Sequence, residues 1–247
     1  MGRLTEAVKH LIILNVIFFA ATAFLGANLG EWLALYFPKN EHFGFWQFVS
    51  HMFMHGGFMH ILFNMYALWA FGSPLEQMWG RNKFIFFYFS AGIGAGLIYT
   101  AVNYFQFNSV YNELISIGMQ SSDIKSLLEF GRYNSDILER IPENRLSEIY
   151  QIYNTPAVGA SGAIYGVLVA FGMTFPNAKL ALIFLPVPIS AKYFIPVLIG
   201  LDLFSGVTGF SIFGGGIAHF AHVGGALIGF IMMKYWQKTQ FNNNRWN

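Results

Sequence analysis

The sequence predicts an all-α polytopic membrane protein built on a bundle of six transmembrane helices. Composition is the first observation, because 55% of the 247 residues are hydrophobic and only 11% are charged. Such a chain is too apolar for one soluble domain. The second observation is a set of six apolar runs that are long enough, or nearly so, to cross about 30 Å of hydrocarbon. These runs cover residues 8–27, 57–72, 84–104, 157–175, 193–207 and 220–236.

The distribution of basic residues is the third observation, and it orients the bundle. When both termini are placed inside, the inner segments hold nine Lys and Arg residues, and the short outer loops hold only Lys39. This asymmetry satisfies the positive-inside rule. The first apolar run has no small-residue cleavage site after it, so we interpret it as a retained helix. The nine inner basic residues are Arg3, Lys9, Arg81, Lys83, Lys179, Lys192, Lys234, Lys238 and Arg245.

Composition also excludes several classes of function. The chain has no cysteine, which excludes disulfides, thiolate metal sites and thiol catalysis. A net charge of +2 is too small to indicate a nucleic-acid partner. We therefore expect the lipid bilayer to be the main environment of the chain.

The connections between the apolar runs differ in character. The outer segment between the first two runs is rich in aromatic residues, which favour the membrane interface. Three prolines, at 176, 186 and 188, exclude one continuous helix before the fifth run. We interpret residues 105–156 as an extramembrane insertion within a single membrane domain that covers residues 1–247. Its spacing of apolar residues predicts two or three short amphipathic helices, with stripes formed by Ile124, Leu127, Leu128 and Phe130 and by Leu146, Ile149, Tyr150 and Tyr153.

The segment from Thr155 to Gly166 places a serine among glycines and alanines where the fourth run begins. Thr155 is a suitable helix cap and Pro156 suits a first turn, so we expect Ser161 about two turns inside a helix. Gly162 and Gly166 are four residues apart, a spacing that lets another helix approach closely. By itself, such a serine is either packing filler or a nucleophile that needs a base.

Polar residues of two other runs fall at the same depth as this serine. His60 and Asn64 are one turn apart near the outer end of the second run. His222 lies near the outer end of the sixth run and shares a face with Gly225 and Gly229. Ionisable groups are costly in a membrane and therefore indicate a functional site.

This layer of side chains has the parts needed for acyl transfer. His222 is a suitable base for Ser161, and His60, Asn64 and backbone amides are donors for an oxyanion. No carboxylate is expected at that depth, so a Ser-His dyad is favoured over a triad. Tyr165, one turn after Ser161, is either a packing partner of the His222 ring or ordinary core.

Three other classes of membrane protein fit less well. A zinc protease would require a third ligand beside His51 and His55, and no suitable one is evident. An aspartyl protease needs two buried acids, and Asp202 is alone. A transporter would spread its polar groups along a pathway instead of gathering them at one outer site. We expect structural roles for His51, His55 and His219, which lie at an interface.

Three motifs together resemble the rhomboid intramembrane serine proteases, of the bacterial six-span type with a long outer insertion. They are Gly159-Ala160-Ser161-Gly162, His55-x4-His60-x3-Asn64 and Ala221-His222-x2-Gly225-x3-Gly229. The resemblance implies Ser161 as nucleophile and His222 as base. It also implies oxyanion donors at His60, Asn64 and the Ser161 amide, and a ring partner at Tyr165. Supporting positions are His55, Gly159, Gly162 and Gly225, and neither a cofactor nor a metal is expected.

Other positions compare with the family in different ways. Asp202 falls where related bacterial members have an aspartate near the end of the fifth span, and Glu76 resembles a structural carboxylate of the inner end. The first outer loop has Trp46-Gln47 where the family often has Trp-Arg, which puts the structural role of that arginine in doubt. The long insertion is unlike the compact bacterial members, and it is either a solvated ornament or a docking or gating element that binds a protein partner.

The sequence thus predicts a serine endopeptidase that cleaves transmembrane protein substrates near the outer surface. It is expected in the bacterial inner (plasma) membrane, with both termini cytoplasmic and the active site opening outward. The alternative is a catalytically inactive rhomboid-like protein that binds transmembrane segments, against which the intact Ser161 and His222 pair argues.

Overall fold

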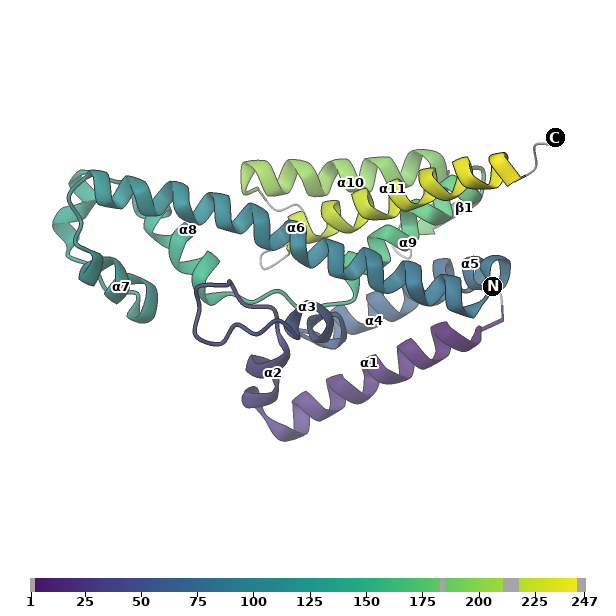
Figure 1. Ribbon diagram of the computed structural model, residues 1–247, viewed down its shortest axis with the longest axis horizontal. Coiled ribbons are helices and arrows are strands. Elements are labelled where there is room, and N and C mark those ends of the chain that lie inside the picture. The colour runs from purple at the N-terminus through teal and green to yellow at the C-terminus, as the bar shows by residue number, and fades with distance from the viewer. Residues whose placement is uncertain (1–2, 183–184, 211–217, 244–247) are drawn as a thin grey trace.

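Helices make up most of the computed structural model, which describes residues 3–182, 185–210 and 218–243 (Figure 1). The N-terminal half contains α1 (Glu6–Leu25), α2 (Ala27–Leu33), α3 (Gln47–Ser50), η1 (His51–Phe53), α4 (Phe58–Ala67), η2 (Leu68–Gly72), α5 (Ser73–Trp79) and α6 (Arg81–Ser116). The C-terminal half contains α7 (Ser121–Phe130), η3 (Ser135–Glu139), α8 (Glu143–Asn154), α9 (Ser161–Thr174), β1 (Lys179–Leu182), β2 (Leu185–Ser190), α10 (Ala191–Thr208) and α11 (His219–Asn243).

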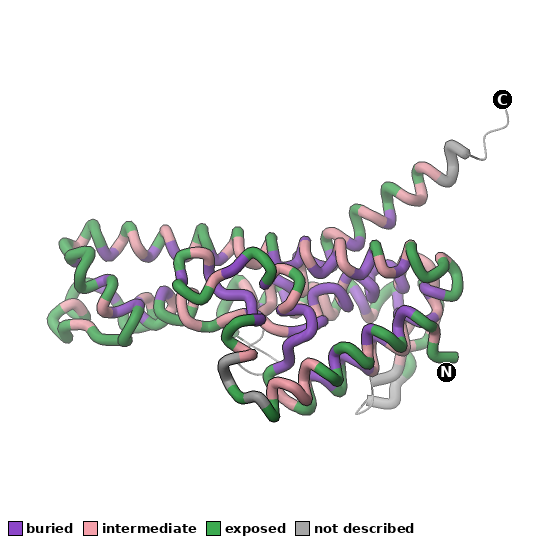
Figure 2. The backbone as a smooth tube through the Cα atoms, turned by 60° about the horizontal axis from the view of Figure 1, so that its bottom comes forward, coloured by how far each residue is buried: buried purple, intermediate pink, exposed green. Residues whose placement is uncertain are grey.

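The six predicted spans are all found as helices, and the chain is a membrane protein. The second span is one continuous helical stretch made of α4, the π-helical η2 and α5. Within the described residues, three helices are long and apolar enough to cross a bilayer, namely Glu6–Phe24, α6 and α10, and α9 is a shorter apolar helix. Exposed residues alternate with buried ones along the helices (Figure 2). Many of the exposed residues have large apolar side chains, as is expected where lipid covers them. Of the predicted inner basic residues, Arg245 lies outside the described part of the chain.

Helix α9 is the centre of the bundle and packs on α6 and α11 through small residues. A Cβ on Gly225 would lie 1.8 Å from the carbonyl oxygen of Gly162, and a Cβ on Gly229 would lie 2.7 Å from Gly166 Cα. On the α6 side, a Cβ on Gly166 would lie 2.6 Å from the Cβ of Ala91. The backbones of α9 and α11 are therefore in direct contact, as the spacing of the glycines predicts.

Helix α1 is joined to the bundle at the end where the termini lie. The carboxylate of Glu76 accepts hydrogen bonds from the backbone N–H groups of Ala7 (2.8 Å) and Val8 (3.0 Å). These are unpaired donors of the first turn of α1, where a negative charge is favoured. Glu76 is thus a structural carboxylate, as the sequence suggests.

The insertion forms a second apolar cluster on an extension of α6 (Figure 1). The third predicted span ends at residue 104, whereas α6 continues without a break to Ser116. Ile124, Leu127 and Leu128 of α7 are buried in this cluster, but Phe130 is 65% exposed, so its place in the predicted stripe is wrong. The amphipathic helices themselves are confirmed, and the cluster's buried residues are Phe37, Phe107, Val110, Leu114, Met119, Ile124, Leu127, Leu128, Ile141, Leu146 and Ile149.

The insertion also contacts the first outer loop. Asn40 donates a hydrogen bond from Nδ2 to the carbonyl oxygen of Tyr153 (2.8 Å). Lys39 Nζ lies 4.8 Å from the centre of the Phe107 ring and 3.3 Å from Asn108 Oδ1. The loop is therefore held on the insertion rather than free.

A short antiparallel hairpin joins α9 to α10, and the sequence analysis did not predict it. Strands β1 and β2 pair with Lys179 opposite Ser190 and Leu180 opposite Ile189. The prolines that exclude a helix in this connection are compatible with a two-stranded ribbon, in which edge positions need no backbone donor.

Candidate active site

Ser161 is the first residue of α9, not a residue two turns inside it. The predicted cap at Thr155 fails because residues before the serine bind the first outer loop instead. Leu35 and Ala157 exchange both backbone hydrogen bonds, at 2.9 and 2.8 Å, and Gly159 N–H donates to the carbonyl oxygen of His51 at 2.9 Å. Ser161 therefore lies at the positive end of a helix, where the first backbone N–H groups have no partner within the helix.

Gly159 has a positive φ of 124°, a conformation that favours glycine. A Cβ at this position would also lie 2.8 Å from His60 Nε2 and 3.5 Å from Ser161 Oγ. The glycine thus lets the turn pass between the serine and the ring of His60.

His222, the predicted base, lies within hydrogen-bonding distance of Ser161. His222 Nε2, from α11, lies 2.9 Å from Ser161 Oγ. The Tyr165 ring is stacked on the His222 ring with 4.2 Å between centroids and 12° between planes. The structure therefore brings Tyr165 onto the imidazole, while the same side chain also packs against the bundle core.

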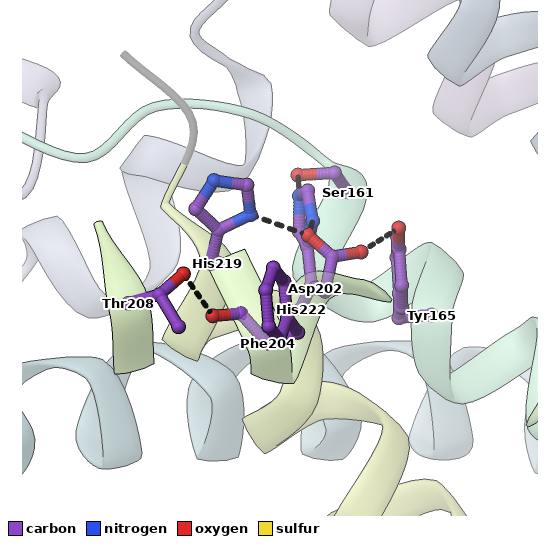
Figure 3. Close-up of polar contacts among 7 residues, drawn as sticks. All are labelled: Ser161, Tyr165, Asp202, Phe204, Thr208, His219 and His222. Atoms are coloured by element: carbon purple, nitrogen blue, oxygen red, sulfur yellow. Dashed lines mark hydrogen bonds and ion pairs between the residues drawn. The ribbon is translucent and has the colours of Figure 1, made fainter. Parts of the chain in front are cut away.

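A carboxylate also reaches the imidazole, which corrects the expectation that none lies at that depth. Asp202 of α10 is 2% exposed, and its Oδ1 lies 3.1 Å from His222 Nδ1 (Figure 3). The same Oδ1 lies 2.6 Å from His219 Nδ1, and Oδ2 accepts a hydrogen bond from the Tyr165 hydroxyl. Ser161, His222 and Asp202 are thus arranged in the order of a triad.

Two of these residues could have been found from the sequence. The fifth span runs outward, so Asp202, near its end, falls in the layer that holds Ser161. His219 precedes His222 by three residues and therefore shares its helix face. His219, for which a structural role was expected, makes a direct contact with the carboxylate.

His55, His60 and Asn64, from α4 and the turn before it, form a second polar group near Gly159. His60 lies beside Gly159, as described above, and its ring meets that of His55 edge to face with 5.0 Å between centroids. Asn64 is buried and donates from Nδ2 to His55 Nε2 at 3.0 Å. His55 therefore links the two predicted oxyanion donors, which supports its expected supporting role.

Two histidines just before α4 are buried and neutral. Burial lowers the pKa of His51 to about 4. Burial also lowers the pKa of His55 to about 4. His51 Nδ1 donates to the carbonyl oxygen of Gln47 at 2.7 Å, which fixes its ring.

Gln47 organises the first outer loop where the family often has arginine. Its side chain is fully buried, and Oε1 accepts a hydrogen bond from Tyr36 N–H at 3.1 Å. Nε2 donates to the carbonyl oxygens of His42 (2.7 Å) and Trp32 (3.2 Å). The neutral amide of Gln47 therefore joins three parts of the first outer loop. Leu35 of this loop pairs with Ala157, in the segment before Ser161.

Comparisons with known proteins agree with this arrangement. A profile of the rhomboid domain matches residues 42–120 and 138–238. The chain is 29% identical over 194 residues to Presenilin-associated rhomboid-like protein A, mitochondrial, of Danio rerio, and 29% identical over 192 residues to its Homo sapiens counterpart. It is 25% identical over 228 residues to Rhomboid protease AarA of Providencia stuartii.

These alignments cover 76%, 77% and 87% of the chain, in the same order, but only 38%, 38% and 59% of the relatives' own lengths. The profile, in contrast, matches well over half of this chain and includes every residue of the site around Ser161. The chain belongs to the rhomboid family.

Proposed function

We propose that the chain is an intramembrane serine endopeptidase that cleaves membrane-anchored proteins near the outer membrane surface. The observation that carries this proposal is the 2.9 Å contact between Ser161 Oγ and His222 Nε2, made by side chains of two different helices. Family membership supports it, because rhomboid proteases act on transmembrane substrates and one relative is named a rhomboid protease.

In the proposed reaction, Ser161 Oγ attacks the carbonyl carbon of the scissile bond while His222 Nε2 accepts the hydroxyl proton. When the tetrahedral intermediate collapses, His222 gives this proton to the leaving amine. Water then attacks the acyl-enzyme with His222 again acting as base. The reaction needs no metal and no cofactor.

The negative oxygen of the intermediate requires donors beside Ser161. The Ser161 N–H at the start of α9 and the His60 ring beside Gly159 are the nearest candidates, and Asn64 supports them from the next turn of α4. Each donor aimed at an oxyanion contributes about 3 kcal/mol to the transition state. A helical substrate hides its carbonyls in its own hydrogen bonds, so we expect cleavage where small or helix-breaking residues let the segment unwind.

The distribution of basic residues supports an orientation with both termini on the inner side of the membrane, which in the proposed bacterial plasma membrane is the cytoplasmic side. In that orientation the insertion and Ser161 lie toward the outer face, and water reaches the site from that side. The bilayer core supplies no water, so an opening at this end is required for hydrolysis.

The test is labelling of the purified protein in detergent with a fluorophosphonate, together with cleavage of a model transmembrane substrate. Labelling and cleavage are expected to disappear in Ser161→Ala. They should persist in Ser73→Ala, which removes another buried serine hydroxyl that makes no hydrogen bond within the described residues. His60→Ala should lower turnover about 100-fold. Full activity of Ser161→Ala would reject the proposal, and a folded chain that neither labels nor cleaves would favour the inactive, segment-binding alternative.

A further inference from the structure

Asp202 is a buried carboxylate on which side chains of two neighbouring helices converge. His219 and His222 of α11 approach Oδ1 at 2.6 and 3.1 Å, and Tyr165 of α9 donates its hydroxyl hydrogen to Oδ2 (Figure 3). A buried carboxylate is tolerated when such donors satisfy its oxygens. The reaction as described so far uses neither Asp202 nor His219.

The last turns of α10 are attached to α11 through the same carboxylate and through the close approach of Gly206 to Phe220. The apolar side chains of α10 that pack on the bundle core end at Ile199. After that point, the buried side chains of this helix are Asp202 and Ser205, and Val207 is 71% exposed. Ser205 Oγ makes no hydrogen bond with the described residues, whereas Asp202 makes three.

The contact with Asp202 also selects the form of His222 that a base requires. An ionised carboxylate only accepts hydrogen bonds, so the His222 nitrogen that faces it, Nδ1, must carry a proton. In neutral imidazole the other nitrogen, Nε2, is then free to accept the proton of Ser161. When Nε2 takes that proton, the negative charge of Asp202 stabilises the imidazolium, and no proton passes to the carboxylate.

We propose that Asp202 is a positioning residue for His222 and that His219 holds the Asp202 carboxylate, so that the end of α10 is tied to the catalytic base. The proposal rests on the proposed function and extends the Ser161 and His222 pair by two residues. Tyr165 fits the same scheme, because it stacks on the ring of His222 and donates to Asp202.

The experiment compares Asp202→Asn, Asp202→Ala and Ser205→Ala by fluorophosphonate labelling rate, substrate kinetics and thermal unfolding in detergent. The Asp202→Asn substitution keeps the shape and one accepting oxygen but removes the charge. We expect kcat and the labelling rate of Asp202→Asn to fall about 100-fold or more, with KM within about threefold and a nearly unchanged unfolding midpoint. Asp202→Ala should lose as much rate and also unfold at a lower temperature. Ser205→Ala, which removes the neighbouring buried hydroxyl, should behave like the unchanged chain.

A second pair of variants tests His219. The His219→Asn substitution keeps a donor for Asp202, and we expect rates within about threefold of the unchanged chain, whereas His219→Leu should lose about tenfold. Equal loss in both variants would contradict the holding role. If Asp202→Asn labels at the same rate as the unchanged chain, the positioning role of Asp202 is overturned, while the proposed function stands. An unchanged chain that does not label would contradict the proposed function, and this proposal with it.

Discussion

The direct contact between α9 and α11 makes Gly225→Ala a sensitive test of the site. The new Cβ would lie 1.8 Å from the carbonyl oxygen of Gly162, about 1.6 Å short of the 3.4 Å at which ordinary contact begins. Because the obstacle is backbone, no side-chain rotation relieves it, and the helices must move apart. A displacement of only half this size would stretch the 2.9 Å contact between Ser161 Oγ and His222 Nε2 to about 3.7 Å, too long for a hydrogen bond.

We therefore expect Gly225→Ala to lower the rate of fluorophosphonate labelling by about 100-fold or more, the contribution of a positioned base. The matched control is Gly200→Ala, which also adds a methyl group to a membrane helix but has nothing within 4 Å of the new Cβ. This control should label at the unchanged rate. Thermal unfolding in detergent confirms that both variants are folded. Gly225→Ala protein that is folded and labels normally would refute the argument that close backbone contact sets the catalytic distance.

The other predictions concern the first outer loop and pH. Gln47→Ala removes the hydrogen-bond partners of the Tyr36 N–H and the His42 carbonyl, whereas the Trp32 carbonyl keeps the Trp46 Nε1 donor. The change should destabilise the fold by about 2 kcal/mol, measured as a lowered unfolding midpoint, whereas Gln77→Ala, at an exposed amide, should not. His51 and His55 have folded pKa values of about 4 against an ordinary 6.5, so the folded state binds fewer protons between these values. Stability should be complete above about pH 6.5 and decline toward pH 4, by about 3 kcal/mol for each histidine. This decline should be shallower in His55→Gln. Identical profiles of stability against pH in the variant and the unchanged chain would contradict the lowered pKa of His55.

Much of the fold follows from local patterns in the sequence. Apolar runs locate all six spans because a membrane helix must bury its backbone in its own hydrogen bonds. The glycines of α9 and α11 predict that another helix approaches each of them closely but not which helix, and the amphipathic spacing predicts α7 and α8. The hairpin before α10 and the length of α6 are not predicted, because both depend on where distant segments pack.

The candidate site was likewise predicted only in part from the sequence. Ser161, His222 and Tyr165 were placed together by order and depth along the spans, and the structure brings them into contact. The start of α9 was placed five residues too early, because the pairing of Ala157 with Leu35 overrides the capping preference of Thr155. Asp202 was recognised as an intramembrane acid but not as a partner of His222, although its place near the outer end of the fifth span puts it in the same layer. The face of α10 that meets His222 is set by how the helices pack.

The unbroken course of α6 sets a geometric limit on substrates. A helix of 36 residues is about 54 Å long, so roughly 24 Å of it extends past the hydrocarbon and carries the insertion as a fixed obstacle on the side of the proposed cleavage point. A folded ectodomain that begins directly at the bilayer would collide with this projection. An extended spacer of about seven residues spans the same height. The helix would thus act as a ruler that selects membrane proteins by the length of the tether between their anchor and their first globular domain.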